Sequence, residues 1–223
     1  MNNCKKNETR GETCEERGDC AMRHKLWAVG LSMGLSLPLC MLGLLGRSEA
    51  LVAAGLYAFY QGFLCGKSVL NSAGENLPGG ELQCNFVSIV AAFIVSLGAL
   101  DVLIFSIWRL TKASLLTAPT PWALLAAAIA ILINYQLSQH SGCVARQPGG
   151  GQMEDLRGSF QTSMLISGLA FAGVLIGQWW PPIDALAAII GVGLLARPIM
   201  GLVTNTNPKT AEQGKKPSPA MAV

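Results

Sequence analysis

The chain has 223 residues, of which 51% are apolar and only 13% are charged. A soluble domain usually carries about 25% charged residues, so this composition argues against a soluble globular protein. The formal net charge is +3, and no basic stripe with interleaved aromatic residues is present, which argues against nucleic acid as a partner. The 7 cysteines are too sparse for a disulfide-stapled secreted domain. The remaining class is a membrane protein with several spans.

Residues 1–25 form a polar segment with six Lys or Arg and five acidic residues. A signal peptide has a short charged start followed by a cleavage site, so we expect a cytoplasmic polar N-terminal tail instead. Cys4, Cys14 and Cys20 lie in this tail, with His24 nearby. Two interpretations stay open, namely reduced thiols without a ligand or a zinc site, although the spacing is not the Cys-x-x-Cys of common zinc sites.

Six apolar stretches follow, and each is long enough, or nearly so, to cross a bilayer as a helix. We place the spans at 26–45, 50–70, 86–110, 122–137, 159–180 and 183–203. The predicted fold class is therefore all-α, a six-transmembrane-helix bundle over residues 26–203. We expect a disordered cytoplasmic tail at 204–223, because this segment is rich in Pro, Lys and Asn.

The distribution of Lys and Arg predicts the orientation, since cytoplasmic segments carry an excess of them. With the N-terminus inside, eleven cations lie in cytoplasmic segments: the six in the first 25 residues, Arg146, Arg157, Lys209, Lys215 and Lys216. Three lie outside, namely Arg47, Arg109 and Lys112. We therefore expect both termini in the cytoplasm.

Three polar residues inside the spans are candidates for function, because ionisable groups at membrane depth are costly unless paired or hydrated. Asp101 is the acidic residue nearest the middle of a predicted span. It either bonds to another helix or faces a crevice of the bundle in protonated form, or it couples transport to protons or ions. We expect Asn134 to join two helices by a hydrogen bond. Asp184 follows two prolines, so we expect it to cap the last helix.

Several short motifs along the chain occur in an order that resembles one transporter family. Residues 43–53 read GLLGRSEALVA, similar to the pattern G-L-x-x-x-S-x-A-L-x-A-D that opens span two in that family. The others are LPGG at 77–80, Asn134 with Cys143, Ser167-Gly168, WPPID at 180–184 and GLV at 201–203. Together these motifs resemble the transmembrane domain of the cation diffusion facilitator family, and within it the members of the magnetosome membrane of magnetotactic bacteria.

This resemblance implies a dimeric protein that exchanges a divalent cation, zinc, iron or manganese, for protons. It also implies a magnetosome or bacterial inner-membrane location, and a metal site between spans two and five. Each span supplies two ligands four residues apart, a spacing that places both on one face of a helix. By the same resemblance we expect the chain to lack the cytoplasmic domain that follows span six in the family.

The family's ligand positions fall on Tyr57 and Gln61 in span two and on Ser159 and Ser163 in span five. None of these side chains is charged at neutral pH, whereas Zn²⁺ and Fe²⁺ prefer imidazole and anionic ligands. The set therefore predicts a degenerate metal site with no resident cofactor.

Three interpretations follow. The chain is a family member that does not transport and instead binds or positions a related transporter, as a homodimer or a heterodimer. Alternatively, it is an active divalent cation–proton antiporter with an altered site, in which Asp101 or Glu81 supplies the missing charge. In the third interpretation it is a six-helix membrane protein and the resemblance misleads. No nucleophile elbow, HExxH, Walker or haem motif is present, so we expect no enzyme activity.

Overall fold

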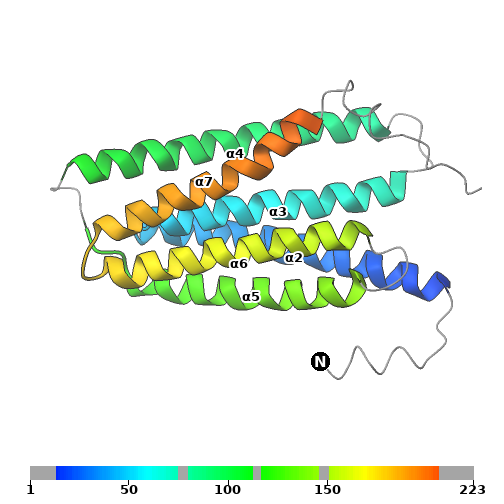
Figure 1. Ribbon diagram of the computed structural model, residues 1–223, viewed down its shortest axis with the longest axis horizontal. Coiled ribbons are helices and arrows are strands. Elements are labelled where there is room, and N and C mark those ends of the chain that lie inside the picture. Colours follow the sequence, from blue (N-terminus) through cyan, green and yellow to red (C-terminus); the bar gives the residue numbers. More distant parts are fainter. Residues whose placement is uncertain (1–13, 75–79, 113–116, 146–150, 206–223) are drawn as a thin grey trace, which may run out of the picture.

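The computed structural model describes residues 14–74, 80–112, 117–145 and 151–205, and these parts of the chain fold into helices without strands. The helices are α2 (Cys14–Leu45), α3 (Glu49–Gly74), α4 (Gly80–Thr111), α5 (Pro121–Ala145), α6 (Gly151–Gly177) and α7 (Pro182–Asn205). Successive helices run in opposite directions along one common axis, so the described chain is an elongated antiparallel bundle (Figure 1). The predicted all-α class is therefore confirmed for these residues.

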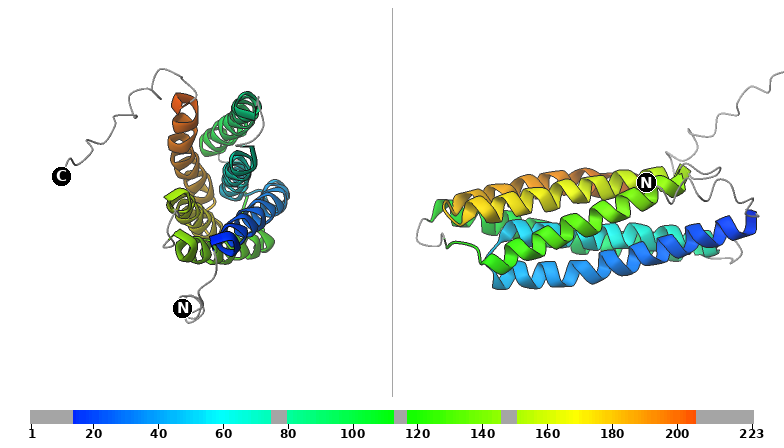
Figure 2. Two further views of the ribbon diagram at one scale, coloured as in Figure 1. Left: turned by 90° about the vertical axis from the view of Figure 1, so that its right-hand side faces the viewer. Right: turned by 90° about the horizontal axis from the view of Figure 1, so that it is seen from below.

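The bundle is built from three helix pairs, α2 with α3, α5 with α6, and α4 with α7. α3 is the central helix, since it contacts α2, α4, α6 and α7. An end view shows α4 and α7 on one side of the bundle and α5 on the opposite side (Figure 2). Among the described helices, α4 contacts α3 and α7, and one of its faces has no helical neighbour.

Local sequence explains where the helices begin and end. Arg47 adopts a left-handed conformation with φ of 55°, which reverses the chain between α2 and α3. The Ser48 hydroxyl accepts a hydrogen bond from the Leu51 amide at 3.2 Å, so Ser48 is the N-cap of α3. Pro121 and Pro182 occupy the first positions of α5 and α7, where the missing N–H has no cost.

Small residues let the helices approach closely. A Cβ atom built on Gly55 would lie 2.6 Å from the Cys40 sulfur, and one on Gly173 would lie 2.7 Å from the Ala187 Cβ. The α2–α3 and α6–α7 contacts therefore require glycine at these two positions. Close packing through small side chains is typical of helices that associate in membranes.

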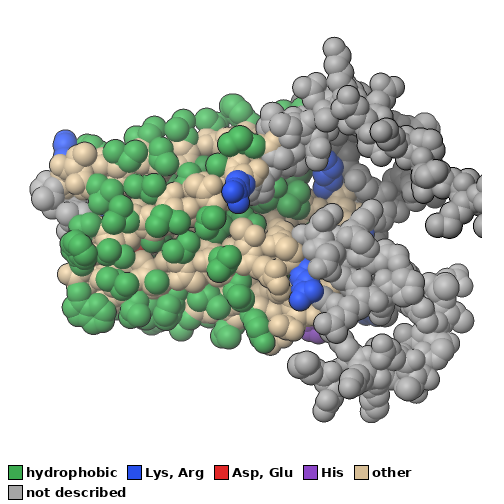
Figure 3. Space-filling model, viewed as in Figure 1, with side chains coloured by type: hydrophobic (Ala, Val, Ile, Leu, Met, Phe, Trp, Pro, Cys, Tyr) green, Lys and Arg blue, Asp and Glu red, His purple; other side chains and the backbone are tan. Residues whose placement is uncertain are grey.

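Large apolar side chains cover the outside of the bundle (Figure 3). Trp27, Trp122, Trp179 and Trp180 are 62–78% exposed. The last three lie at helix ends and Trp27 lies near the start of the apolar segment of α2, as expected for side chains at a membrane–water interface. Four helices contain segments long and apolar enough to cross a membrane: Lys25–Leu45 of α2, Ser88–Thr111 of α4, Pro121–Ser141 of α5 and Leu156–Gly177 of α6. These features together indicate a membrane protein.

The helices are longer than the predicted spans at several ends. α2 begins at Cys14, so the second half of the predicted polar tail continues the first span as one helix. α5 extends to Ala145, eight residues beyond the end that hydropathy predicted. Hydropathy marks only the part of a helix that suits hydrocarbon, and polar residues continue the same helix beyond it. Cys4 lies outside the described residues, and so does the predicted tail at 204–223 except for its first two residues, which end α7.

Candidate functional site

The structure brings span two and span five together at two of the four positions that the family resemblance selects. Tyr57 of α3 donates a hydrogen bond from its hydroxyl to the backbone carbonyl of Ser159 of α6, at 3.3 Å. Gln61 lies one turn further along α3, and Ser163 lies one turn further along α6. Because the two helices are antiparallel, Gln61 and Ser163 extend from this contact toward opposite ends of the bundle (Figure 1).

All four side chains are withdrawn from the surface. Tyr57 and Ser163 are each 2% exposed and Gln61 is fully buried, while Ser159 is partly buried with an inaccessible hydroxyl oxygen. The amide oxygen and nitrogen of Gln61 and the hydroxyl of Ser159 form no hydrogen bond in the described part of the chain. A buried polar group without a partner costs about 1–3 kcal/mol, so this region is not optimised for stability.

None of the four side chains carries a charge at neutral pH. They supply a phenol, an amide and two hydroxyls, and the ring next to them is Tyr60, whose centroid lies 5.9 Å from that of Tyr57. Among the described residues, no group of three His, Cys, Asp or Glu side chains could hold a metal ion. Neutral oxygen ligands of this kind bind Zn²⁺ or Fe²⁺ poorly. Cys14 and Cys20 start α2, but the placement of their side chains lies outside what the structure describes.

The alternative in which Asp101 faces a crevice of the bundle is wrong, while its coupling to protons or ions stays a prediction. Its side chain is exposed on α4, while its neighbour Val102 is buried at 5% exposure. The larger apolar side chains of α4, such as Ile94 and Leu97, face outward, so the most apolar side of this helix is not the side that turns inward. The structure turns the small residues Ala92 and Ala99 toward the core and leaves the carboxylate outside.

The prediction for Asn134 also needs correction. It is buried at 2% exposure, but its amide nitrogen donates to the Ala130 carbonyl of its own helix at 2.9 Å. A short polar side chain can bond to the carbonyl one turn earlier, which satisfies it without a neighbour. The hydrogen bond that the structure gives Asn134 therefore does not join two helices.

A second polar cluster lies at the end of the bundle where α3 and α7 begin and α4 ends. Arg109 and Glu49 form a salt bridge, with side chains exposed by only 4% and 7%. Arg109 also donates to the Arg47 carbonyl at 3.1 Å and to the Thr117 carbonyl at 3.0 Å. This guanidinium therefore joins α4 to the α2–α3 turn and to the segment before α5.

Asp184 completes the cluster from the first turn of α7. One of its carboxylate oxygens accepts from the Ser48 hydroxyl at 2.8 Å, and the other accepts from the Glu49 backbone amide at 2.9 Å. Asp184 lies in the first turn of α7, as predicted, but its carboxylate caps the N-terminus of α3 and not that of its own helix. A carboxylate is favoured there because the first amides of a helix have no partner within the helix.

We call Ser48, Glu49, Arg109 and Asp184 the end cluster. Sequence reasoning missed it and treated Arg109 only as a charge outside the membrane. The positions of the four residues in the sequence could have indicated the cluster. All four stand at ends of predicted spans, and spans that alternate in direction bring these ends to the same side of the bundle. Pairing them still required the lateral order of the helices, which the span pattern does not contain.

These observations define a helical membrane bundle with a neutral buried contact between α3 and α6. Over 180 residues the chain is 27% identical to Magnetosome protein MamB of Magnetospira sp. (strain QH-2), covering 78% of this chain and 61% of that protein. The chain thus spans less than two thirds of the length of the curated relative. No family model and no solved structure matches the chain.

Proposed function

We propose that the chain is a multi-pass membrane protein of the cation diffusion facilitator type with a degenerate metal site, and that it acts by binding a related transporter. Similarity to a magnetosome protein over 78% of the chain supports the family and a magnetosome or bacterial inner-membrane location. Within the magnetosome members, the order and spacing of the motifs taken together are the basis for a proposed likeness to the MamV type.

The single observation that carries the proposal is the contact between α3 and α6. The four family positions occupy these two helices, and Tyr57 touches Ser159, yet none of the four carries a carboxylate or an imidazole. A divalent cation that loses its water shell needs such ligands, and proton exchange needs a group that titrates near neutral pH. The arrangement keeps the positions of a metal site without the side chains that would bind the metal.

The topology that we propose has six spans with both termini in the cytoplasm. α3 and α7 contain 26 and 24 residues, or about 39 and 36 Å of helix at 1.5 Å per residue. Either length exceeds the hydrocarbon core of about 30 Å, so both helices can cross it beside the four apolar ones. The excess of Lys and Arg in the predicted cytoplasmic segments supports this orientation.

The alternative function is an active divalent cation–proton antiporter with an altered site. Its support is the buried amide of Gln61, which has polar atoms available to a ligand. Metal flux into proteoliposomes separates the two functions, with Zn²⁺, Mn²⁺ and Fe²⁺ tested against an imposed proton gradient. We expect no flux above that of empty vesicles, and flux above that level would establish the antiporter.

Introducing metal-binding side chains at the family positions tests whether these positions are correctly assigned. The triple variant Gln61→Asp, Ser159→His, Ser163→Asp puts two carboxylates and an imidazole at the ligand positions that the family resemblance selects, so we expect it to bind zinc. The control Gln61→Asn, Ser159→Ala, Ser163→Ala should not bind zinc. Isothermal titration measures binding, and circular dichroism reports whether each variant is folded. A folded triple variant without zinc binding would overturn this placement of the site.

A further inference from the structure

The face of α4 that turns away from the bundle carries an acidic residue at membrane depth. Asp101 is exposed, and it stands 13 residues after Ser88 and 10 residues before Thr111 in an apolar segment long enough to cross a membrane. At 1.5 Å per residue it lies about 20 Å and 15 Å from the two ends. This position is close to the middle of the hydrocarbon core, where a carboxylate is costly and is normally paired.

Within the described chain, Asp101 has no hydrogen bond and no salt bridge. The cations at the end of the same helix are engaged elsewhere. Arg109 is buried against Glu49, and the Lys112 ammonium lies over the Trp108 ring, 5.0 Å from its centroid. The Asp101 carboxylate is therefore unpaired within the described bundle and accessible to a group outside it.

The side chains around Asp101 form a regular seam. Ile94, Leu97, Ile104 and Trp108 are 44–58% exposed, and with Asp101 they are spaced alternately by three and four residues. This spacing repeats every 3.5 residues on average, which is the pattern of helices that pack at about 20° in membrane bundles. One polar residue in such a seam sets the register of the partner helix.

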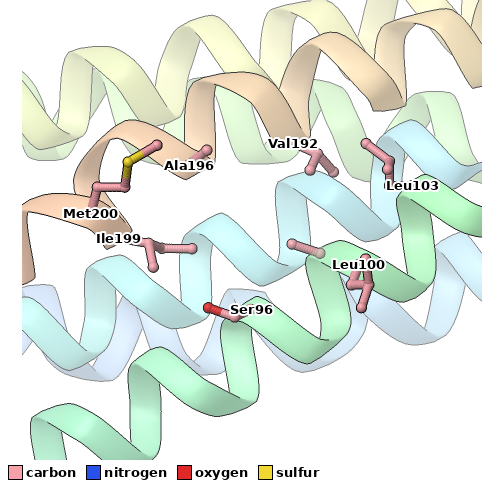
Figure 4. A pocket seen from close by; sticks show the side chains of 8 residues that line it. Ser96, Leu100, Leu103, Val192, Ala196, Ile199 and Met200 are labelled. Atoms are coloured by element: carbon pink, nitrogen blue, oxygen red, sulfur yellow. The ribbon is translucent and has the colours of Figure 1, made fainter. Parts of the chain in front are cut away.

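The groove between α4 and α7 is a separate feature (Figure 4). Its lining is apolar except for Ser96, and Asp101 is not part of it. Leu100 and Leu103 line the groove, whereas Leu97 and Ile104 belong to the seam. The acidic seam is thus a second surface of α4, distinct from the groove.

We propose that the seam at Ile94, Leu97, Asp101, Ile104 and Trp108 is a docking surface for a transmembrane helix of a second protein that carries Lys or Arg opposite Asp101. Charge complementarity selects this occupant. A second copy that packed α4 symmetrically against α4 would bring Asp101 toward Asp101, and like charges at close range are unfavourable. The inference rests on the partner role proposed above and names the chemistry of the partner.

The experiment uses the full chain in lipid vesicles with a synthetic leucine–alanine transmembrane helix as the probe. Energy transfer between labels on the two molecules measures their association. We expect a probe with a central Lys to bind about 3- to 20-fold more tightly than one with a central Leu, the range that polar contacts between membrane helices produce. Asp101→Leu should remove this preference, and Asp101→Lys should transfer it to a probe with a central Asp.

A relocated acid is the matched control. Leu132 is 64% exposed on α5 and stands 11 residues from Pro121, a depth similar to that of Asp101. The double variant Asp101→Leu, Leu132→Asp should not recover binding, because Leu132 is not part of the seam. Recovery in that variant, or unchanged binding in Asp101→Leu, would overturn the proposal. So would energy transfer between two copies of the chain that Asp101→Leu abolishes.

The probe assay requires neither metal nor a related transporter, so its outcome is separable from that of the proposed function. If the Lys probe shows no preferential binding while a related transporter is still extracted with the chain, the proposed docking surface is wrong and the proposed partner role is unaffected. If the flux assay is positive, the partner role is wrong whatever the probe does.

Discussion

The bundle buries two groups of polar side chains that differ in charge and in hydrogen bonding. The end cluster contains Glu49, Arg109 and Asp184, whose charges are paired or bonded to helix amides. The contact between α3 and α6 contains Tyr57 and Gln61, which are neutral, and the amide of Gln61 has no partner in the described chain. The charged group lies at an end of the bundle, and the neutral group lies part way along it.

This difference indicates what the ionisable residues of the membrane domain do. A buried charge is retained where a partner offsets its desolvation, and the end cluster provides such partners for three helix ends. The contact between α3 and α6, where the family resemblance places the metal ligands, carries only amide and hydroxyl groups. The buried charges of the end cluster therefore hold helices together, and the four positions at the contact between α3 and α6 carry none.

The largest expected effect comes from removing the cation of the end cluster. Arg109→Met leaves Glu49 buried without its counter-ion, which typically costs about 3–5 kcal/mol of folding free energy. Unfolding in mixed micelles with increasing SDS measures the change. The control Lys112→Met removes an exposed cation from the same end of α4 and should cost less than about 1 kcal/mol. Equal effects of the two variants would contradict the contrast between the regions.

A smaller effect is expected from the N-cap of α3. Ser48→Ala removes the acceptor of the Leu51 amide and one donor to Asp184, so it should destabilise by about 1 kcal/mol, within a range of 0.5–2. Ser106 is the matched control, because it is fully buried and its hydroxyl has no partner in the described residues. Ser106→Ala should therefore be neutral or slightly stabilising in the same SDS titration. A loss of stability in Ser106→Ala as large as that in Ser48→Ala would show that the hydrogen bonds of Ser48 contribute little.

The third prediction has the opposite sign. Gln61→Leu replaces a buried amide that lacks a partner by an apolar side chain of similar size, so stability should rise by up to about 1 kcal/mol. Tyr57→Phe, the control on the same helix, loses the 3.3 Å hydrogen bond to Ser159 and should lower stability by about 0.5 kcal/mol. Destabilisation by Gln61→Leu would mean that the amide has a partner in the folded protein, which removes the observation that supports the antiporter alternative.

Hydropathy predicted the helices well and their orientation about their own axes poorly. The predicted span at 26–45 ends at Leu45, where α2 ends, and the span at 183–203 lies within α7. The crevice considered for Asp101 was wrong, because the large apolar side chains of α4 face outward in a membrane protein and the most apolar face of the helix is not its inner face. The true position of Asp101 depends on which side chains pack against α3 and α7.

The composition and apolar runs were sufficient to determine a helical membrane protein, because crossing hydrocarbon requires long stretches with few charges. The motifs were sufficient to choose four positions on two spans, and counting along the chain was enough to find neutral residues there. Only the packed bundle decided that Tyr57 reaches Ser159, that Asp184 caps α3 rather than α7, and that Arg109 is buried against Glu49. These pairings join residues 60 to 135 positions apart, so they depend on the lateral order and rotation of the helices, which local sequence does not encode.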